Sequence, residues 1–324
     1  MRVLALTLVL LAAASGTQAQ TTLRYGQIPS SIRSVSSLQY QVAQRQGYFA
    51  KEGLTIVPVP IDGGTDFMIQ ALDKGSVDIT RTATPYLITA VLAGSDAAAV
   101  AGEVGNSIYS LIARPEVKSF ADLKGKTVGL SLAVDTISIS TRKLIAMNGL
   151  EDADYRVKEL VGTPARATCL KGGECAATPL GQPEDFQLIA QGYHRLGLST
   201  DAVPDSVMTV SAVRRAWAAE HKDAVVRFVR AFAQSFRFIR DPANRAAVVK
   251  IITESTGASE AIARDTLTLY YEPDRGVFPK QAEINMKGLA QVIQFMGEVG
   301  QVKGALPPPE RFVDLSYLAA AGVR

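Results

Sequence analysis

The sequence predicts an α/β fold of two similar lobes that face each other across a cleft. A segment of ten residues occurs twice, since residues 71–80 align without a gap on residues 169–178. Each copy is expected to end a helix, turn at glycine and continue into a short apolar strand that finishes in threonine. Upstream, residues 23–27 and 126–130 match as strands that lead into Ser-rich helix starts. Two such units predict two lobes, and small ligands are usually held in clefts of this kind.

The first 19 residues are expected to be a secretory signal peptide. Arg2 supplies a positive start, residues 3–14 are apolar, and residues 17–19 offer a cleavage point. The apolar stretch is too short to be a transmembrane helix. We therefore expect export and removal of this segment, which leaves about 300 residues for two lobes.

The charged residues favour a small ligand over a nucleic acid. The chain has 34 Lys and Arg against 31 Asp and Glu, a net charge of +3, and these residues are scattered along the sequence. A nucleic-acid-binding protein is expected to gather its basic residues in a patch or stripe. We expect no nucleic-acid partner.

The cysteines, Cys169 and Cys175, lie on either side of a glycine turn in the second copy of the repeat. An even number of cysteines in an exported chain predicts a disulfide, and closing so small a loop contributes about 2 kcal/mol. The alternative is two buried thiols, because the first copy has Ala71 and Val77 at these positions. A metal site is the weakest interpretation, since no His or further Cys lies nearby.

In the first lobe, the pattern of apolar residues, prolines and glycines predicts alternating strands and helices. Ser34, Ser36 or Ser37 can cap the first helix, and two prolines place the second strand near a sheet edge. The expected order is strand 23–27, helix to about 46, strand 54–61, helix 66–74, strand 77–80 and helix 85–92.

The second lobe repeats this alternation, which favours parallel sheets. Residues 100–112 are expected to cross into it, and residues 206–213 to cross back. Between them we expect a short helix in 119–126, strand 127–130, a helix capped by Asp135 or Thr136 and ending near 147, strand 155–161, helix 164–171, strand 175–178, and a helix or strand in 186–192. Helices 214–240, 244–253, 258–269 and 281–297 and an exposed tail from 307 follow. The expected division is residues 20–106 and 207–324 for lobe 1, and 107–206 for lobe 2.

Four stretches, taken in order, carry a family resemblance. They are residues 46–54, Gly64 with 71–78, residues 120–129 and the helix 218–240. Together they resemble the type II periplasmic solute-binding proteins of ABC importers, in the sulfonate, nitrate and taurine group that includes thiamine-precursor-like proteins. The resemblance implies two Rossmann-like lobes joined by a hinge that the chain crosses twice.

The resemblance also implies a function. The protein would capture a small anionic organic solute, a sulfonate, carboxylate or nitrate-like compound, and deliver it to an inner-membrane permease with its ATPase. It would act as a monomer, without cofactor, metal or catalytic residue. One alternative is an enzyme of the same fold that makes pyrimidine or menaquinone precursors, although the iron motif rich in Cys and the substrate His of the pyrimidine synthases are missing here. Another alternative is a sensory solute-binding module.

The expected ligand site lies beyond the carboxyl ends of the strands, where helix N-termini present free N–H groups. The candidate residues are small, hydroxylated or charged residues of these segments: Ser30, Ser31, Arg33, Gly64, Thr65, Thr80, Arg81, Thr82, Asp135, Thr136, Ser138 and Thr178. Tyr25, Tyr86 and Tyr109 are either aromatic contacts or core residues.

Three of these candidates carry charge, and each has an alternative interpretation, which for Arg33 is a solvated loop residue. Arg81 could bind a carboxylate or sulfonate through two parallel hydrogen bonds. Otherwise it pairs with an acid such as Asp62, Asp66 or Asp78 and holds a loop. Asp135 at a helix start is expected to be a cap. If it faces the cleft, it would repel an anion or recruit an amine.

Overall fold

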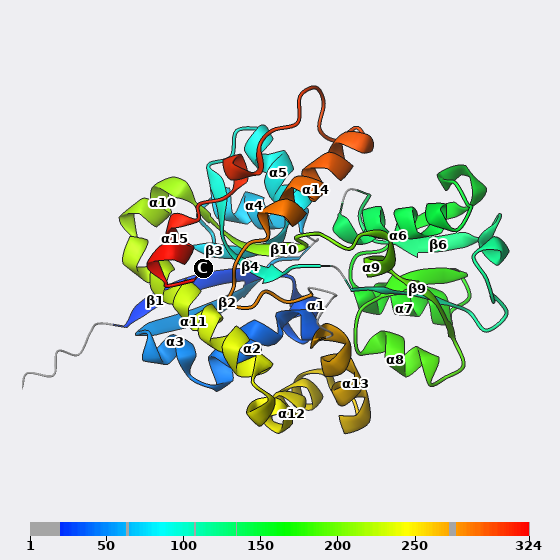
Figure 1. Cartoon of the computed structure of the whole chain (residues 1–324), viewed down its shortest axis with the longest axis horizontal. Coiled ribbons are helices and arrows are strands. Elements are labelled where there is room, and N and C mark those ends of the chain that lie inside the picture. The colour runs from blue at the N-terminus through cyan, green and yellow to red at the C-terminus, as the bar shows by residue number, and fades with distance from the viewer. Residues whose placement is uncertain (1–19, 63–64, 107, 134, 272–276, 324) are drawn as a thin grey trace, which may run out of the picture.

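The computed structural model describes residues 20–62, 65–106, 108–133, 135–271 and 277–323 (Figure 1). The expected signal peptide and the candidate site residue Gly64 lie outside these ranges. No helix of the described residues is long and apolar enough to cross a membrane.

Two five-stranded sheets form the centres of two lobes, and Figure 1 shows lobe 2 in green beside the larger lobe 1. The sheet of lobe 1 has the order β2-β1-β3-β10-β4, with β1 (Thr21–Gln27), β2 (Leu54–Pro60), β3 (Ile79–Ala83), β4 (Ala97–Val104) and β10 (Thr209–Arg214). The sheet of lobe 2 has the order β7-β6-β8-β5-β9, with β5 (Ser110–Ala113), β6 (Thr127–Leu130), β7 (Arg156–Glu159), β8 (Ala177–Leu180) and β9 (His194–Leu198).

Each sheet is mixed, whereas the alternation of strands and helices favoured parallel sheets. Strands β1, β2 and β3 run parallel, as do β6, β7 and β8. Strand β10 runs antiparallel to β3 and β4, and β5 runs antiparallel to β8 and β9. Strands β5 and β10 are the ones that enter a sheet after the chain has crossed between lobes. Because no helical crossover connects them to a neighbouring strand, nothing forces them to be parallel.

The helices cover the faces of the two sheets (Figure 1). Lobe 1 carries α1 (Pro29–Ile32), α2 (Leu38–Arg45), α3 (Tyr48–Lys51), α4 (Asp66–Asp73), α5 (Thr84–Leu92), α10 (Arg215–Glu220), α11 (Lys222–Arg240), α12 (Arg245–Thr256), α13 (Glu260–Tyr271), α14 (Met286–Glu298) and α15 (Ser316–Ala320). Lobe 2 carries α6 (Thr136–Met147), α7 (Thr163–Lys171), α8 (Glu184–Ile189) and α9 (Ser199–Ala202). Short 3-10 turns lie at Val35–Ser37, Ala121–Leu123, Asp152–Asp154, Pro242–Asn244 and Pro309–Phe312.

Three local expectations differ from the structure. Strand β3 continues to Ala83, so Arg81 lies within the strand rather than beyond its tip. The long helix expected at 214–240 is split at His221, which joins α10 to α11. The predicted exposed tail is wrong, because Phe312 is fully buried and Val313 bridges to Ala99 of β4. Its apolar side chains cover the edge of the sheet.

The repeated segment forms the same contact in both lobes. The Thr80 hydroxyl donates to the carbonyl of Gly26 at 3.3 Å, and the Thr178 hydroxyl donates to the carbonyl of Gly129 at 2.8 Å. A Cβ at Gly26 or Gly129 would lie 2.9 Å or 3.1 Å from the corresponding threonine oxygen. Glycine therefore leaves the space in which each threonine binds the neighbouring strand.

The predicted disulfide is confirmed. Cys169 and Cys175 are bonded, with their Cα atoms 5.3 Å apart, and they connect the end of α7 to the residues that lead into β8. In lobe 1 the matching Val77 is fully buried and packs in the apolar core. The same position thus holds an apolar contact in one lobe and a covalent link in the other.

The two lobes differ in the size of their cores. The core of lobe 1 contains a cluster of aromatic rings from β1, α2, α3 and α11: Tyr25, Tyr40, Phe49, Phe228 and Phe232. The main core of lobe 2 consists mostly of aliphatic side chains and is smaller. Helix α14 of lobe 1 also reaches lobe 2, where Phe295 packs with Ile139 and Val203.

Candidate functional site

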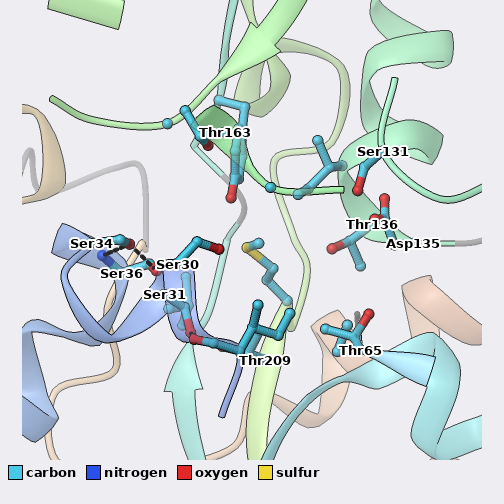
Figure 2. A pocket seen from close by; sticks show the side chains of 18 of the residues that line it. Ser30, Ser31, Ser34, Ser36, Thr65, Ser131, Asp135, Thr136, Thr163 and Thr209 are labelled. Carbon is cyan, nitrogen blue, oxygen red and sulfur yellow. Dashed lines mark hydrogen bonds between the residues drawn. The ribbon is translucent and has the colours of Figure 1, made fainter. Parts of the chain in front are cut away.

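A cavity of about 120 Å³ is lined by residues of both lobes (Figure 2). Hydroxylated side chains from both lobes surround it: Ser30, Ser31, Ser34, Ser36, Thr65, Thr82 and Thr209 from lobe 1, and Ser131, Thr136 and Thr163 from lobe 2. Apolar side chains complete the walls: Ile28, Val104, Ile108, Leu132, Ile137, Val161 and Met208. The cavity therefore suits a ligand with an apolar body and several polar atoms.

Arg81 lies in the lobe 1 wall, where its guanidinium is held by protein atoms. Its Nε is 3.2 Å from Oε2 of Glu103, and both side chains are buried. The Nη1 donates to the Ser37 hydroxyl at 3.0 Å, and the Nη2 donates to the Ser36 carbonyl at 3.1 Å. The alternative interpretation of Arg81, an ion pair that holds the local structure, fits these contacts. The acid is Glu103, while Asp78, one of the expected partners, pairs with Arg24 at 2.5 Å.

Asp135 both caps a helix and lines the cavity. Its carboxylate accepts from the backbone N–H of Ser138 at 2.8 Å at the start of α6, and only 5% of the residue is exposed. Burial raises the pKa of this carboxyl, and hydrogen bonds from Ser131 and from backbone N–H groups oppose that rise.

Thr136 is the next residue of this wall, and its hydroxyl is free to bind a ligand. Among the described residues no partner bonds its Oγ1, although only 6% of the residue is exposed. Figure 2 shows this oxygen turned toward the cavity. An unpartnered buried hydroxyl is costly unless something fills the site.

Arg166 on α7 is a site residue that sequence reasoning missed. It is 1% exposed and lines the cavity. Its guanidinium donates to the carbonyls of Pro179 at 2.7 Å and Leu160 at 3.1 Å, and to the Thr163 hydroxyl at 3.2 Å. Burial lowers the pKa of Arg166, although the phenol of Tyr109 and two nearby carboxylates favour the charged form.

Arg166 differs from Arg81 in its electrostatic partners. No carboxylate of the described residues lies within ion-pair distance of Arg166. A signal for its burial was also present in the sequence. Arg166 precedes Cys169 and Leu170 by three and four positions, so it lies on the buried face of α7.

Two further cavity residues follow β8: Gln182, at the end of the segment 178–182 that the repeat places near the site, and Glu184, which sequence reasoning missed. Gln182 is 2% exposed, and its amide nitrogen donates to Asp185 at 2.9 Å. Glu184 is half-buried at the start of α8, and burial is the main cause that raises its pKa. Asp185 is separately bound by Ser110 at 2.6 Å and by Arg195 at 3.0 Å.

The structure brings together some of the candidate residues and not others. Those that line the cavity are Ser30, Ser31, Thr65, Arg81, Thr82, Asp135 and Thr136, and Tyr109 joins them. Thr80, Ser138 and Thr178 are buried away from the cavity, and Arg33 borders a separate surface groove beside Arg45 and Glu254. The two threonines are set back because their hydroxyls bind the neighbouring strand of the sheet.

Solved structures with this fold include solute-binding proteins, one of them from an ABC-type import system. The ligand-binding component of such a system from Staphylococcus aureus matches with a TM-score of 0.77 and 15% identity over 93% of this chain and 99% of that chain. The nitrate-binding protein NrtA of Synechocystis gives 0.74 and 15% over 94% and 89%. The alkanesulfonate-binding protein SsuA of Xanthomonas axonopodis, bound to MOPS, gives 0.71 and 19% over 92% and 99%. These likenesses establish the fold.

The family is established by sequence. No curated protein gives a significant sequence match. The model of the NMT1/THI5-like family matches residues 35–245, which include most of lobe 1's first segment and all of lobe 2. The chain belongs to the NMT1/THI5-like family.

Proposed function

We propose that this protein is the solute-binding component of an ABC importer. It would bind a small organic solute between its lobes in the periplasm and present it to a membrane permease and its ATPase. The observation that carries the proposal is the cavity, whose walls come from both lobes and hold polar groups that no other described residue binds. Family membership and the fold shared with ABC-type import proteins support it.

Contacts to both lobes are what such a function needs. A ligand can drive closure only if it binds the closed arrangement better than the open one. Here Ser30 and Thr65 lie on the lobe 1 side of the cavity, and Thr136 and Thr163 lie on the lobe 2 side (Figure 2). A solute that touches both sets would favour closure.

Arg166 favours an acidic group on the solute. A guanidinium has five N–H donors. Three hydrogen bonds and the contact with Tyr109 leave at least one donor for a carboxylate or sulfonate oxygen. The apolar walls favour an organic acid over a bare inorganic anion such as nitrate.

The alternative of a fold-related enzyme receives less support. Within the described residues, neither His nor Cys lines the cavity, and both cysteines are in the disulfide. Covalent catalysis usually needs an activated nucleophile beside a base. A sensory role would use the same cavity, and a permease that binds the closed protein distinguishes transport from sensing.

A thermal-shift screen of the purified protein tests the proposal. The panel contains nitrate, alkyl and aryl sulfonates, carboxylates, amines and amino acids. A true ligand at one hundred times its Kd should raise stability by about 2.7 kcal/mol. Arg166→Lys should lower affinity for acids by about tenfold, because lysine loses the planar fork of donors.

The matched control is Arg156→Lys, on the exposed face of β7 in the same lobe. It should leave binding unchanged. The proposal fails if no member of the panel stabilises the protein. Arg166 is removed from the site if both variants bind alike while circular dichroism shows that both are folded.

A further inference from the structure

Three side chains of lobe 2 form a wall of hydrogen-bond acceptors on one side of the cavity. We name Asp135, Gln182 and Glu184 the acceptor wall. All three line the cavity, and they come from the start of α6 and from the segment that joins β8 to α8. Within the described part of the chain none of the three has a Lys or Arg nitrogen at ion-pair distance, although Arg166 acts on both carboxylates from further away.

Gln182 supplies the first evidence. Its Nε2 donates to Oδ2 of Asp185 at 2.9 Å, which fixes the amide so that Oε1 remains an acceptor. Among the described residues nothing bonds that Oε1, although Gln182 is 2% exposed. A buried acceptor without a donor is a costly feature that a ligand donor would satisfy.

The two carboxylates supply the second evidence. Asp135 accepts from backbone N–H groups and the Ser131 hydroxyl. Glu184 accepts from its own backbone N–H. Within the described residues neither carboxylate lies within the 4.0 Å ion-pair distance of a Lys or Arg nitrogen. Burial disfavours the charged form of both carboxyls and raises both pKa values.

The charged groups around the cavity also favour a solute with a positive group. Arg81 is neutralised by Glu103, which lies behind it at 3.2 Å. The remaining charged groups of the lining are one cation, Arg166, and two carboxylates, Asp135 and Glu184. A solute that carried only negative charge would increase the excess of negative over positive groups in the cavity.

We propose that the solute carries a hydrogen-bond-donating cation, an ammonium or amidinium group, that binds to Asp135, Gln182 and Glu184. This inference rests on the proposed function and specifies its substrate. An acidic group on the same solute faces Arg166, so the preferred ligand is an organic zwitterion with an apolar body. Each hydrogen bond between charged groups adds affinity, and the two carboxylates gain a counter-charge in direct contact, in addition to the more distant Arg166.

Matched pairs of probes test the inference by isothermal titration. The pairs are 4-(aminomethyl)benzoate with 4-methylbenzoate, and 6-aminohexanoate with hexanoate, because each pair differs mainly in the amine. We expect at least one amine-bearing compound to bind, and to bind at least about tenfold more tightly than its partner. Glu184→Gln should remove most of that difference.

The control variant is Glu159→Gln, which changes an exposed glutamate on β7 of the same lobe. It should leave the preference for the amine intact. The inference is overturned if the amine-free acids bind as well as their partners, and that result leaves the proposed function standing. It is also overturned if neither amine-bearing probe binds. Failure of the whole screening panel would instead count against the proposed function.

A second measurement requires no ligand. Because burial raises the pKa of Glu184, its ionised form destabilises the empty protein above that pKa, and the penalty disappears as pH falls toward the unfolded value of about 4.3. Groups that act on Glu184 or share its cavity are Asp135, Asp185, Arg81, Arg166, Lys171, Tyr109 and Tyr270. Glu184→Gln should therefore raise the Tm of the empty protein at about pH 7, and by less at about pH 4.5.

The same two pH values are used for Glu159→Gln, whose Tm should match that of the unaltered protein. A Glu184→Gln variant that is less stable at neutral pH would show that the carboxylate already has a partner in the protein. That result would contradict the proposal that the acceptor wall binds a cation of the solute.

Discussion

In lobe 1, Thr80 binds the carbonyl of Gly26, and in lobe 2, Thr178 binds the carbonyl of Gly129. Around this shared contact the two lobes are stabilised by different means. Val77 packs into a large core in lobe 1, whereas Cys175 at the same place is bonded to Cys169. The smaller lobe buries less apolar surface, so a covalent link compensates for the difference.

The lobes also differ in the groups that surround a buried arginine. Arg81 of lobe 1 is neutralised by Glu103, which also accepts from Tyr25 at 2.7 Å and Gln39 at 2.9 Å. Arg166 of lobe 2 is bound by carbonyls and a hydroxyl, while Asp135 and Glu184 act on its charge from beyond ion-pair distance. A guanidinium in a cleft thus has a structural role where an acid pairs with it and is available to a ligand where none does.

Arg81→Met should have the largest effect on folding. It leaves Glu103 buried without its cation, and breaking a buried pair in this way costs about 3–5 kcal/mol. The double variant with Glu103→Gln should recover part of the loss, because it removes the unpaired charge. Urea unfolding measures both. A loss below about 1 kcal/mol for the single variant would mean that the pair contributes little.

Replacing the disulfide by its lobe 1 counterparts should have an intermediate effect. The variant Cys169→Ala with Cys175→Val puts the residues found at Ala71 and Val77 into lobe 2, and should lose about 2 kcal/mol. Unfolding with and without a reducing agent measures this loss. The reductant should destabilise the unaltered protein and leave the variant unchanged. Equal sensitivity of both proteins would show that the link does not stabilise lobe 2.

The contact between the lobes outside the cavity should have the smallest effect. Lys143 of α6 pairs with Glu298 of α14 at 2.8 Å and lies over the ring of Phe295. Because the pair is partly exposed, Lys143→Met should change ligand affinity by less than about fivefold. Titration of the protein with its ligand measures the change in affinity. It is repeated at two salt concentrations because salt screens an exposed ion pair, and the exposed Lys303→Met is the control. A larger effect would make this contact a determinant of closure.

The general fold was predictable because it depends on local periodicity and on the repeat. Strands β1, β2 and β6 lie close to their expected ranges. The repeat also predicted that Thr80 and Thr178 occupy equivalent positions in the two lobes, but it did not predict the direction of their hydroxyls. Thr80 and Thr178 were expected to bind ligand, and the hydroxyl of each binds the neighbouring strand of the sheet. That outcome depends on a glycine far away in sequence.

The charged part of the site was harder to predict. Arg81 and Glu103 lie on strands that meet only through β10, so their pairing depends on the order of the sheet. Glu184 begins α8, in the gap between the strand expected to end at 178 and the helix or strand expected from 186. Whether a charge faces a cavity or another charge is decided by contacts between distant segments.

The insertion of β10 between β3 and β4 has a consequence for how the polypeptide acquires its shape during synthesis. All five strands of the second sheet lie in one uninterrupted stretch that ends at Leu198, so that half can assemble as soon as it has left the ribosome. The other half is made first yet stays incomplete until Thr209–Arg214 emerges and fills the gap. Lobe 2, which is encoded in the middle of the chain, can therefore be complete before lobe 1, whose synthesis begins earlier and ends later.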